Sequence, residues 1–252
     1  MKRRVLIGAM VMGSLLAACG DDPATSGMTK RGYFFPAHRF KLTVEVDTPQ
    51  GVRRGSSVIQ VRPSISGYEI DGEAAAVDLP DGQTLFVLLR SEAEESADWA
   101  GLASTWAPQN IQDTWVFPGS EADASEMERG KYFWEHVAEY RGTVPVPRTR
   151  KMPWGPIDNY PYFVRFKDVT DPSSVEMVDP DDLAASFGAG YRLNSLSATF
   201  TSDPIIYTLQ NRFDWLKKYP EPRLEKIPSG GTVDPTFAQK ISHGDFQRKT
   251  KK

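Results

Sequence analysis

Hydrophobic and polar residues alternate with a period of two near the start of the region that we expect to fold. Residues 40–46 read FKLTVEV, and residues 54–61 alternate again after a short connection that contains Pro and Gly. Such alternation places one set of side chains in a core and the other set in solvent, and Pro with Gly is typical of turns. The pattern predicts a β-hairpin whose polar face carries Lys41, Thr43 and Glu45.

A second hairpin is expected directly afterwards. Residues 72–79 and 84–90 are candidate strands, and the turn residues Pro80–Gln83 between them contain an Asp-Gly pair, a strong hairpin signal. The segment Phe86–Leu89 is apolar at every position. Because a strand buried on both faces is apolar throughout, this strand is expected in the interior of a sheet.

The rest of the chain predicts more strands than helices. Further strands are expected at 162–166, 174–178 and 192–201, and helices at 93–103, 125–140, 179–187 and 205–216. Residues 109–117 fit a helix or a strand, and the Pro-rich stretch 142–161 is predicted to be one long extended loop. In the helix at 179–187, Asp179 is expected at the N-cap and Pro180 at the first helical position.

Hairpin connections without a βαβ alternation indicate the fold class. We expect an α+β or mostly β fold, in which an antiparallel sheet or small sandwich built from hairpins packs against two or three short helices.

The first eighteen residues have the composition of a secretory signal. Cations occupy positions 2–4, and an apolar run follows from Val5 to Ala18. That run is shorter than the roughly 20 residues that a membrane-spanning helix needs, and it ends in two small residues, as signal peptidases require. No second apolar segment of the chain is long enough to cross a membrane.

The segment Leu16–Cys19, with the sequence LAAC, resembles the bacterial lipobox. This resemblance implies that a diacylglycerol is attached to the Cys19 thiol and that the chain is cut before Cys19. Cys19 is the only cysteine, so no intrachain disulfide can form. An ordinary cleaved signal with an unmodified thiol and an uncleaved anchor are the alternatives. Gly20 at the next position favours the outer membrane over the inner one, with the domain facing the periplasm.

These observations divide the chain into four parts. We predict a signal peptide at 1–18, a lipidated tether at 19–31, a single folded α+β domain at 32–219 and a mobile tail at 220–252 that is rich in Pro and Gly.

Charge and motifs exclude some classes of function. Removal of Lys2, Arg3 and Arg4 with the signal reduces 30 Lys and Arg to 27, against 33 Asp and Glu. A mildly acidic chain is not typical of nucleic-acid binders, so no nucleic-acid partner is expected. The sequence contains neither a phosphate-binding loop nor a dinucleotide fingerprint, and no cofactor is predicted.

Two stretches carry a resemblance to a known family. Residues 43–59 read TVEVDTPQGVRRGSSVI, and residues 171–188 read DPSSVEMVDPDDLAASFG. Together they resemble a family of uncharacterised bacterial proteins that are often predicted lipoproteins. The resemblance implies the same location in the cell envelope and no particular activity.

Three groups of residues are candidates for a functional site. The acidic patch comprises Asp168, Asp171, Asp179, Asp181 and Asp182, whose spacing does not match an EF-hand loop. The histidines His38, His136 and His243 are far apart in sequence and lack the i, i+4 spacing of a helical metal site. The aromatic group comprises Tyr132, Phe133, Trp134, Trp154, Tyr160, Tyr162 and Phe163, and it could form a binding face or part of the core.

No catalytic set or metal site follows from these patterns. No Gly-x-Ser-x-Gly elbow occurs, and the one cysteine is expected to be acylated. We therefore expect a membrane-anchored envelope lipoprotein whose domain binds an envelope protein or a small molecule without catalysis. The alternative is an envelope hydrolase or metal-dependent enzyme that uses the acidic patch.

Overall fold

The structure, a computed structural model, describes most of the region predicted to fold. It covers residues 36–64, 67–93, 99–101, 135–152, 155–218, 223–231 and 234–250. Cys19 lies outside these residues, as do most of the helix predicted at 125–140 and all of the segment 109–117.

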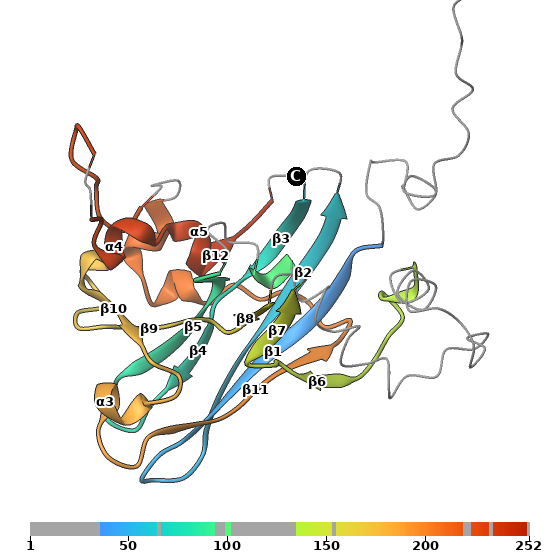
Figure 1. The fold of residues 1–252 in the computed structure, drawn as a ribbon, viewed down its shortest axis with the longest axis horizontal. Helices are drawn as coiled ribbons and strands as arrows, with labels where there is room; N and C mark the ends of the chain where they lie inside the picture. Colours follow the sequence, from blue (N-terminus) through green and yellow to red (C-terminus); the bar gives the residue numbers. More distant parts are fainter. Residues whose placement is uncertain are drawn as a thin grey trace, which may run out of the picture.

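Two antiparallel sheets form the body of the domain (Figure 1). The six-stranded sheet has the order β12–β3–β2–β1–β11–β6, with β1 His38–Asp47, β2 Arg53–Ser64, β3 Gly67–Glu73, β6 Thr143–Pro145, β11 Arg192–Phe200 and β12 Gln247–Arg248. The four-stranded sheet has the order β10–β9–β5–β4, with β4 Ala75–Asp78, β5 Thr84–Ser91, β9 Pro161–Phe166 and β10 Val175–Val178. The mostly β, antiparallel fold class that the sequence predicts is therefore confirmed.

Shorter elements complete the domain. The strands β7 Thr149–Met152 and β8 Gly155–Asp158 pair only with each other in the described part of the chain. The helical turns are η1 Pro172–Ser174, α3 Leu183–Phe187, η2 Leu209–Asn211, η3 Asp214–Lys218, α4 Phe237–Lys240 and α5 His243–Phe246. Among the described residues, no helix has the length and apolar character needed to cross a bilayer.

The first predicted hairpin is confirmed as β1 and β2, and the alternation of apolar and polar residues along β1 matches the burial of one of its faces. Along β1 buried and half-exposed residues alternate without a break. Phe40 lies opposite Ile59 on one side and Phe200 on the other, while Lys41 and Thr43 face outward. The apolar residues of β1 therefore point toward the four-stranded sheet.

The inner cluster is the hydrophobic core between the two sheets. It includes Phe40, Leu42, Val44, Ile59, Leu85, Val87, Leu89, Phe163, Leu196 and Phe200. The sheets approach closely where β2 meets β4, since a Cβ atom on Gly55 would lie 2.0 Å from the carbonyl oxygen of Ala76. Only glycine fits at that position of β2.

The outer cluster is a second core on the opposite face of the four-stranded sheet. It includes Phe86, Leu88, Val164, Phe166, Leu209, Phe213, Trp215, Ile241 and Phe246. Strand β5 alternates between the two clusters, with Leu85 and Val87 in the inner one and Phe86 and Leu88 in the outer one. The prediction of an interior, doubly buried strand is thus confirmed.

The prediction of a mobile tail from residue 220 is wrong for the described part of that segment. The helices α4 and α5 cover the four-stranded sheet (Figure 1), and Ile241 and Phe246 are fully buried in the outer cluster. Strand β12 then pairs with β3, placing Gln247 opposite Glu73. Short helices with apolar side chains on one side cover a sheet face that would otherwise expose Phe86 and Phe166.

Two other local predictions are corrected. The stretch 142–161 is not one loop, because β6 pairs with β11 as the edge strand of the six-stranded sheet and β7 pairs with β8. Pro145 fits an edge strand, whose outer side needs no donor. The predicted helix at 205–216 has no regular secondary structure up to Thr208, and the 3₁₀ turns η2 and η3 follow.

The helix predicted at 179–187 is shorter than expected. The carboxylate of Asp182, rather than that of Asp179, accepts the N-cap hydrogen bond, from the amide of Ala185. Asp179 instead accepts from the amide of Asp181 in the preceding turn. The helix ends before Gly188, which has a φ of 101°.

Candidate functional site

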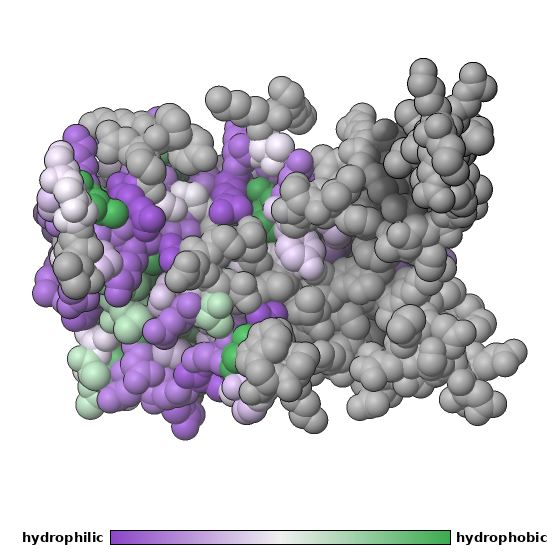
Figure 2. All heavy atoms as spheres, turned by 45° about the horizontal axis from the view of Figure 1, so that its top comes forward, coloured by the Kyte–Doolittle hydropathy of each residue, from purple (hydrophilic) through white to green (hydrophobic). Residues whose placement is uncertain are grey.

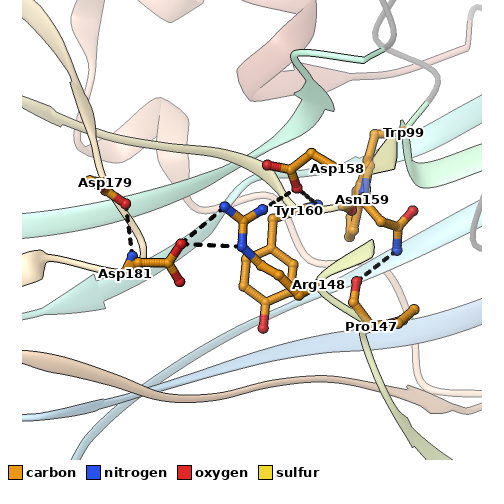
Figure 3. Close-up of polar contacts among 8 residues, drawn as sticks. All are labelled: Trp99, Pro147, Arg148, Asp158, Asn159, Tyr160, Asp179 and Asp181. Carbon is orange, nitrogen blue, oxygen red and sulfur yellow. Dashed lines mark hydrogen bonds and ion pairs between the residues drawn. The ribbon is translucent and has the colours of Figure 1, made fainter. Parts of the chain in front are cut away.

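Part of the acidic patch and part of the aromatic group meet at one arginine, Arg148. Its guanidinium donates hydrogen bonds to the carboxylates of Asp158 and Asp181, with 3.1 Å between Nη2 of Arg148 and Oδ2 of Asp181. The guanidinium carbon also lies 4.9 Å from the centroid of the Tyr160 ring. Figure 3 shows these side chains converging from the β7–β8 hairpin and from the turn before α3.

Buried groups fix the backbone beneath Arg148. The amide of Asn159 donates to the carbonyl oxygen of Arg148 at 2.9 Å, and Nδ2 of Asn159 donates to the carbonyl of Pro147 at 3.0 Å. The buried indole of Trp99 donates to the carbonyl of Asn159 at 2.7 Å (Figure 3). The position of Arg148 is therefore set by main-chain contacts rather than by its ion pairs alone.

The Arg148 site, defined as Arg148, Asp158, Tyr160 and Asp181, is open to solvent on its polar side. Arg148 and Asp158 are about half exposed, and Asp181 is more so. Burial lowers the pKa of Arg148, whereas hydrogen bonds to Asp158 and Asp181 raise it, and the net direction is upward. Burial raises the pKa of Tyr160. The site thus offers a permanent cation on an aromatic ring beside two carboxylates, an arrangement suited to binding polar groups.

Four of the five acidic-patch carboxylates are used in local turns and caps. Asp168 accepts from the amide and hydroxyl of Thr170, which lower its pKa. Asp171 accepts from the amide and hydroxyl of Ser173. Asp179 accepts a hydrogen bond within the turn before α3, and Asp182 is the N-cap of α3. Asp181 alone points to another element, toward Arg148.

The acidic patch does not form a shared pocket. All five carboxylates belong to exposed residues. In the described part of the chain, no three Asp, Glu, His or Cys side chains are grouped so that they could hold a metal ion. The arrangement expected for a carboxylate-based hydrolase is therefore not present in this patch.

The described members of the predicted aromatic face point to different places. Tyr160 packs beside Phe163 and the inner cluster, with ring centroids 6.1 Å apart. Tyr162 packs beside Phe237 and the outer cluster, with ring centroids 5.3 Å apart. A single face containing both rings is therefore a wrong prediction, because Tyr162 lies in β9 on the side of the outer cluster, whereas Tyr160 precedes β9 and does not follow its alternation. Tyr132, Phe133, Trp134 and Trp154 lie outside the described residues.

The histidines do not come together. His38 is buried and stacks on Phe200 beside the inner cluster, and burial lowers its pKa to about 4. His243 is buried against Trp215 in the outer cluster, with ring centroids 5.2 Å apart. His136 is half-buried. The buried positions of His38 and His243 agree with structural roles for these two histidines.

Buried charged residues in the outer region were not predicted from the sequence. The carboxylate of Glu73, 3 % exposed, accepts hydrogen bonds from the amides of Thr208 and Leu209, from the hydroxyl of Thr208 and from Nε2 of Gln247. Asp245 is also buried and accepts from Ser242. An acid in a strand gives no sequence signal of burial when its donors lie far away in the chain.

Comparisons with known proteins give no match. No protein-family model, no characterised protein and no solved structure matches this chain. The resemblance to predicted lipoproteins remains a prediction from the two quoted stretches.

Proposed function

We propose that this protein is a lipoprotein of the bacterial cell envelope, anchored through Cys19, whose β-sandwich domain binds a partner without catalysis. The observation that carries the proposal is the N-terminal sequence: three cations, an apolar run and the LAAC segment that ends at Cys19. Acyl chains on that cysteine supply enough buried hydrocarbon for stable anchoring. The outer membrane is favoured over the inner one, and the domain faces the periplasm.

The distance between the anchor and the domain is compatible with this arrangement. About 17 residues separate Cys19 from Pro36, the first described residue, and they can span at most roughly 60 Å. A segment of that length lets the sandwich stand clear of the membrane surface. The buried inner and outer clusters give the domain the core that an independent module needs.

The anchor is tested with the protein purified from membranes beside a Cys19→Ala variant. We expect the wild type to start at Cys19, to carry acyl mass by intact-mass spectrometry and to partition into detergent, and the variant to do neither. A wild type that starts at Cys19 but is unmodified and water-soluble would contradict the lipoprotein proposal.

We infer that the binding surface includes the Arg148 site. Arginine and tyrosine are enriched where proteins bind one another, and here the contacts of Asn159 hold the backbone of Arg148 in place, with its guanidinium over the Tyr160 ring. The site also borders the β7–β8 hairpin, whose connecting residues include Trp154 of the predicted aromatic face.

Capture from detergent-solubilised envelopes, with the lipidated protein as bait, tests this assignment. Arg148→Ala is compared with Arg212→Ala, a matched control whose side chain is 39 % exposed, against 40 % for Arg148, and pairs with Asp78. Loss of a partner from the Arg148 variant alone would support the assignment. Equal recovery with both variants would remove the Arg148 site from the binding surface.

The hydrolase alternative has less support. It depends on the acidic patch forming one pocket, and four of those five carboxylates are engaged in local turns and caps.

A further inference from the structure

Two arginines from distant parts of the chain donate to the same main-chain carbonyl. Arg90 lies near the end of β5, and Arg223 lies in the segment that precedes α4. Nη1 of Arg90 donates to the carbonyl oxygen of Lys240 at 2.6 Å, and Nη1 of Arg223 donates to the same oxygen at 2.8 Å. The two guanidinium groups, called the arginine pair below, therefore approach each other closely at the end of α4.

Capping of α4 uses only part of the arginine pair. Arginine side chains often donate to the last carbonyls of a helix, and Arg223 also donates to the carbonyl of Gln239 at 3.0 Å. Both arginines use Nη1 for these bonds, and neither donates from Nε or Nη2 to a described residue. Nε of Arg90 is buried without a hydrogen-bond partner in the described chain, although 14 % of this side chain is exposed. The pair thus keeps donors for a ligand with several acceptor oxygens.

The positive charge of the arginine pair is only partly balanced. Oδ2 of Asp245 lies 3.6 Å from Nη1 of Arg90, but it already accepts from the amide and the hydroxyl of Ser242 at 2.8 and 2.9 Å. Arg223 is exposed and forms no ion pair with a described residue. Because two cations held this close repel each other, an anion that contacts both is stabilised.

Two acids of the segment 223–245 lie at the start of α4 rather than at its end. The carboxylate of Glu225 accepts from Oγ1 of Thr236 and from Nε2 of Gln239, at 2.8 and 3.1 Å. Asp234 is exposed and precedes the same turn. Lys240, in contrast, is exposed at the end where the arginine pair lies. These acids therefore do not neutralise the pair.

The hydroxyl of Tyr162 supplies a further donor near Arg90. Tyr162 stands on β9, which pairs with β5, and its ring packs against Phe237 of α4 with centroids 5.3 Å apart. Burial raises the pKa of Tyr162, the charges of Glu92 and Asp245 raise it further, and the charge of Arg90 lowers it. The net direction is upward, so the phenol stays protonated at neutral pH and can donate. Glu92 is exposed and lies close enough to oppose an anion here.

We propose that the arginine pair binds a phosphate group at the end of α4, with the hydroxyl of Tyr162 as a third donor. One guanidinium fork satisfies the two oxygens of a carboxylate, whereas two guanidinium groups and a phenol suit the three free oxygens of a phosphate group. Figure 2 brings the top of Figure 1, where α4 and α5 lie, toward the viewer and shows a mainly hydrophilic described surface with few hydrophobic side chains. Such a surface suits a small polar ligand. The phosphate site shares no residue with the Arg148 site and does not depend on the lipid anchor.

Titration calorimetry of the full-length protein in detergent with inorganic phosphate, at constant ionic strength, tests this proposal. Arg223→Gln removes one cation of the pair at an exposed position. Arg141→Gln is the matched control, because Arg141 is also exposed and its Nη1 also donates to two main-chain carbonyls, those of Ala138 and Tyr140. Unchanged thermal midpoints verify that the variants are folded.

We expect the wild type to bind phosphate in a saturable way. Arg223→Gln should weaken binding about tenfold or more, because charge-assisted hydrogen bonds are lost, and Tyr162→Phe should weaken it by a smaller factor. Glu92→Gln should tighten binding about threefold, since a carboxylate that repels the ligand is removed. Arg141→Gln should bind like the wild type.

A wild type without saturable phosphate binding would overturn the proposal, as would equal losses in the Arg223 and Arg141 variants. Two further ligands distinguish the sources of the phosphate group. Tighter binding of glycerol phosphate, a monoester, would support the site and assign it to a free phosphate ester. Tighter binding of glycerophosphoglycerol, a diester, would support the site and assign it to a phospholipid headgroup.

Discussion

The inner and outer clusters are both well-buried cores, but different kinds of chain build them. Strands that alternate between apolar and polar residues supply the inner cluster, as β1 does with Phe40, Leu42 and Val44. The outer cluster combines sheet and irregular chain: Phe86 and Phe166 from strands meet Phe213, which lies between η2 and η3, and Phe246 from α5.

The two clusters also differ in how polar groups are used. Outward-facing residues of β1 stay near solvent, whereas the chain that covers the outer cluster is attached through buried acids such as Glu73 and Asp245. Burial raises the pKa of Asp71, but hydrogen bonds from Thr250 and Arg62 lower it by a larger amount, so the net shift of this pKa is downward. Irregular chain makes few backbone hydrogen bonds of its own, so side-chain acceptors satisfy its donors.

The largest expected effect comes from the outer cluster. Phe246→Ala should reduce the free energy of unfolding by about 3–5 kcal/mol, because its fully buried ring packs against Phe86, Phe166 and Trp215. Denaturant unfolding followed by tryptophan fluorescence measures the loss. Ile227→Ala, at an exposed position of the same segment, is the control and should cost below about 0.5 kcal/mol. A loss below 1 kcal/mol for Phe246→Ala would mean that the segment is as mobile as its sequence predicts.

The next effect is a pH dependence that arises in the inner region. Burial lowers the pKa of His38 to about 4, from an ordinary value of 6.5. Between these values the unfolded chain binds the proton and the folded one does not, so stability decreases as the pH is lowered from 6.5 and the slope levels off near 4. The total corresponds to about 3 kcal/mol.

The His38→Phe variant, measured by denaturant unfolding across this range, isolates that contribution. The wild type should lose stability relative to the variant as the pH falls from 6.5 to 4. A constant difference across the range would show that His38 titrates alike in both states.

A smaller effect tests the attachment of the outer chain. Glu73→Gln should destabilise the protein by about 2 kcal/mol, because the amide NH₂ group cannot accept the bonds that Thr208 and Leu209 donate. Limited proteolysis should also cut residues 223–250 sooner in this variant. Glu69→Gln, half-buried on the same strand, should leave both measurements nearly unchanged. An equal response of the two variants would show that Glu73 has no special role.

The contrast between the clusters explains what the sequence could and could not predict. The β1–β2 and β4–β5 hairpins and the doubly buried β5 follow from alternation and turn residues, which are local signals. The docking of residues 223–250 depends on α4 and α5, four-residue helices that are too short to show a hydrophobic period. It also depends on Glu73, an acid 135 residues before its partner Thr208. A Pro- and Gly-rich composition therefore predicts mobility where tertiary contacts produce order.

The candidate site follows the same rule. The residues of the Arg148 site lie in a Pro-rich stretch and in the turn before α3, where turn-forming Asp and Pro explain local structure only. Arg148 and Asp181 are 33 positions apart, and the sequence carries no signal that the two meet. Tyr160 and Tyr162 were grouped because they are close in sequence, but only Tyr162 lies in β9, and the chain before that strand directs Tyr160 to the other cluster.

The smallest expected effect separates surface chemistry from stability. Arg148→Ala and Arg212→Ala should each change the free energy of unfolding by less than about 1 kcal/mol, because exposed ion pairs are screened by solvent and their side chains lose entropy when paired. Matching denaturation curves would mean that any partner lost by the Arg148 variant is lost through its surface and not through unfolding. A destabilisation of 2 kcal/mol or more for Arg148→Ala alone would instead show that Arg148 stabilises the inner cluster. The side chain over Tyr160 would then contribute packing that reaches this cluster.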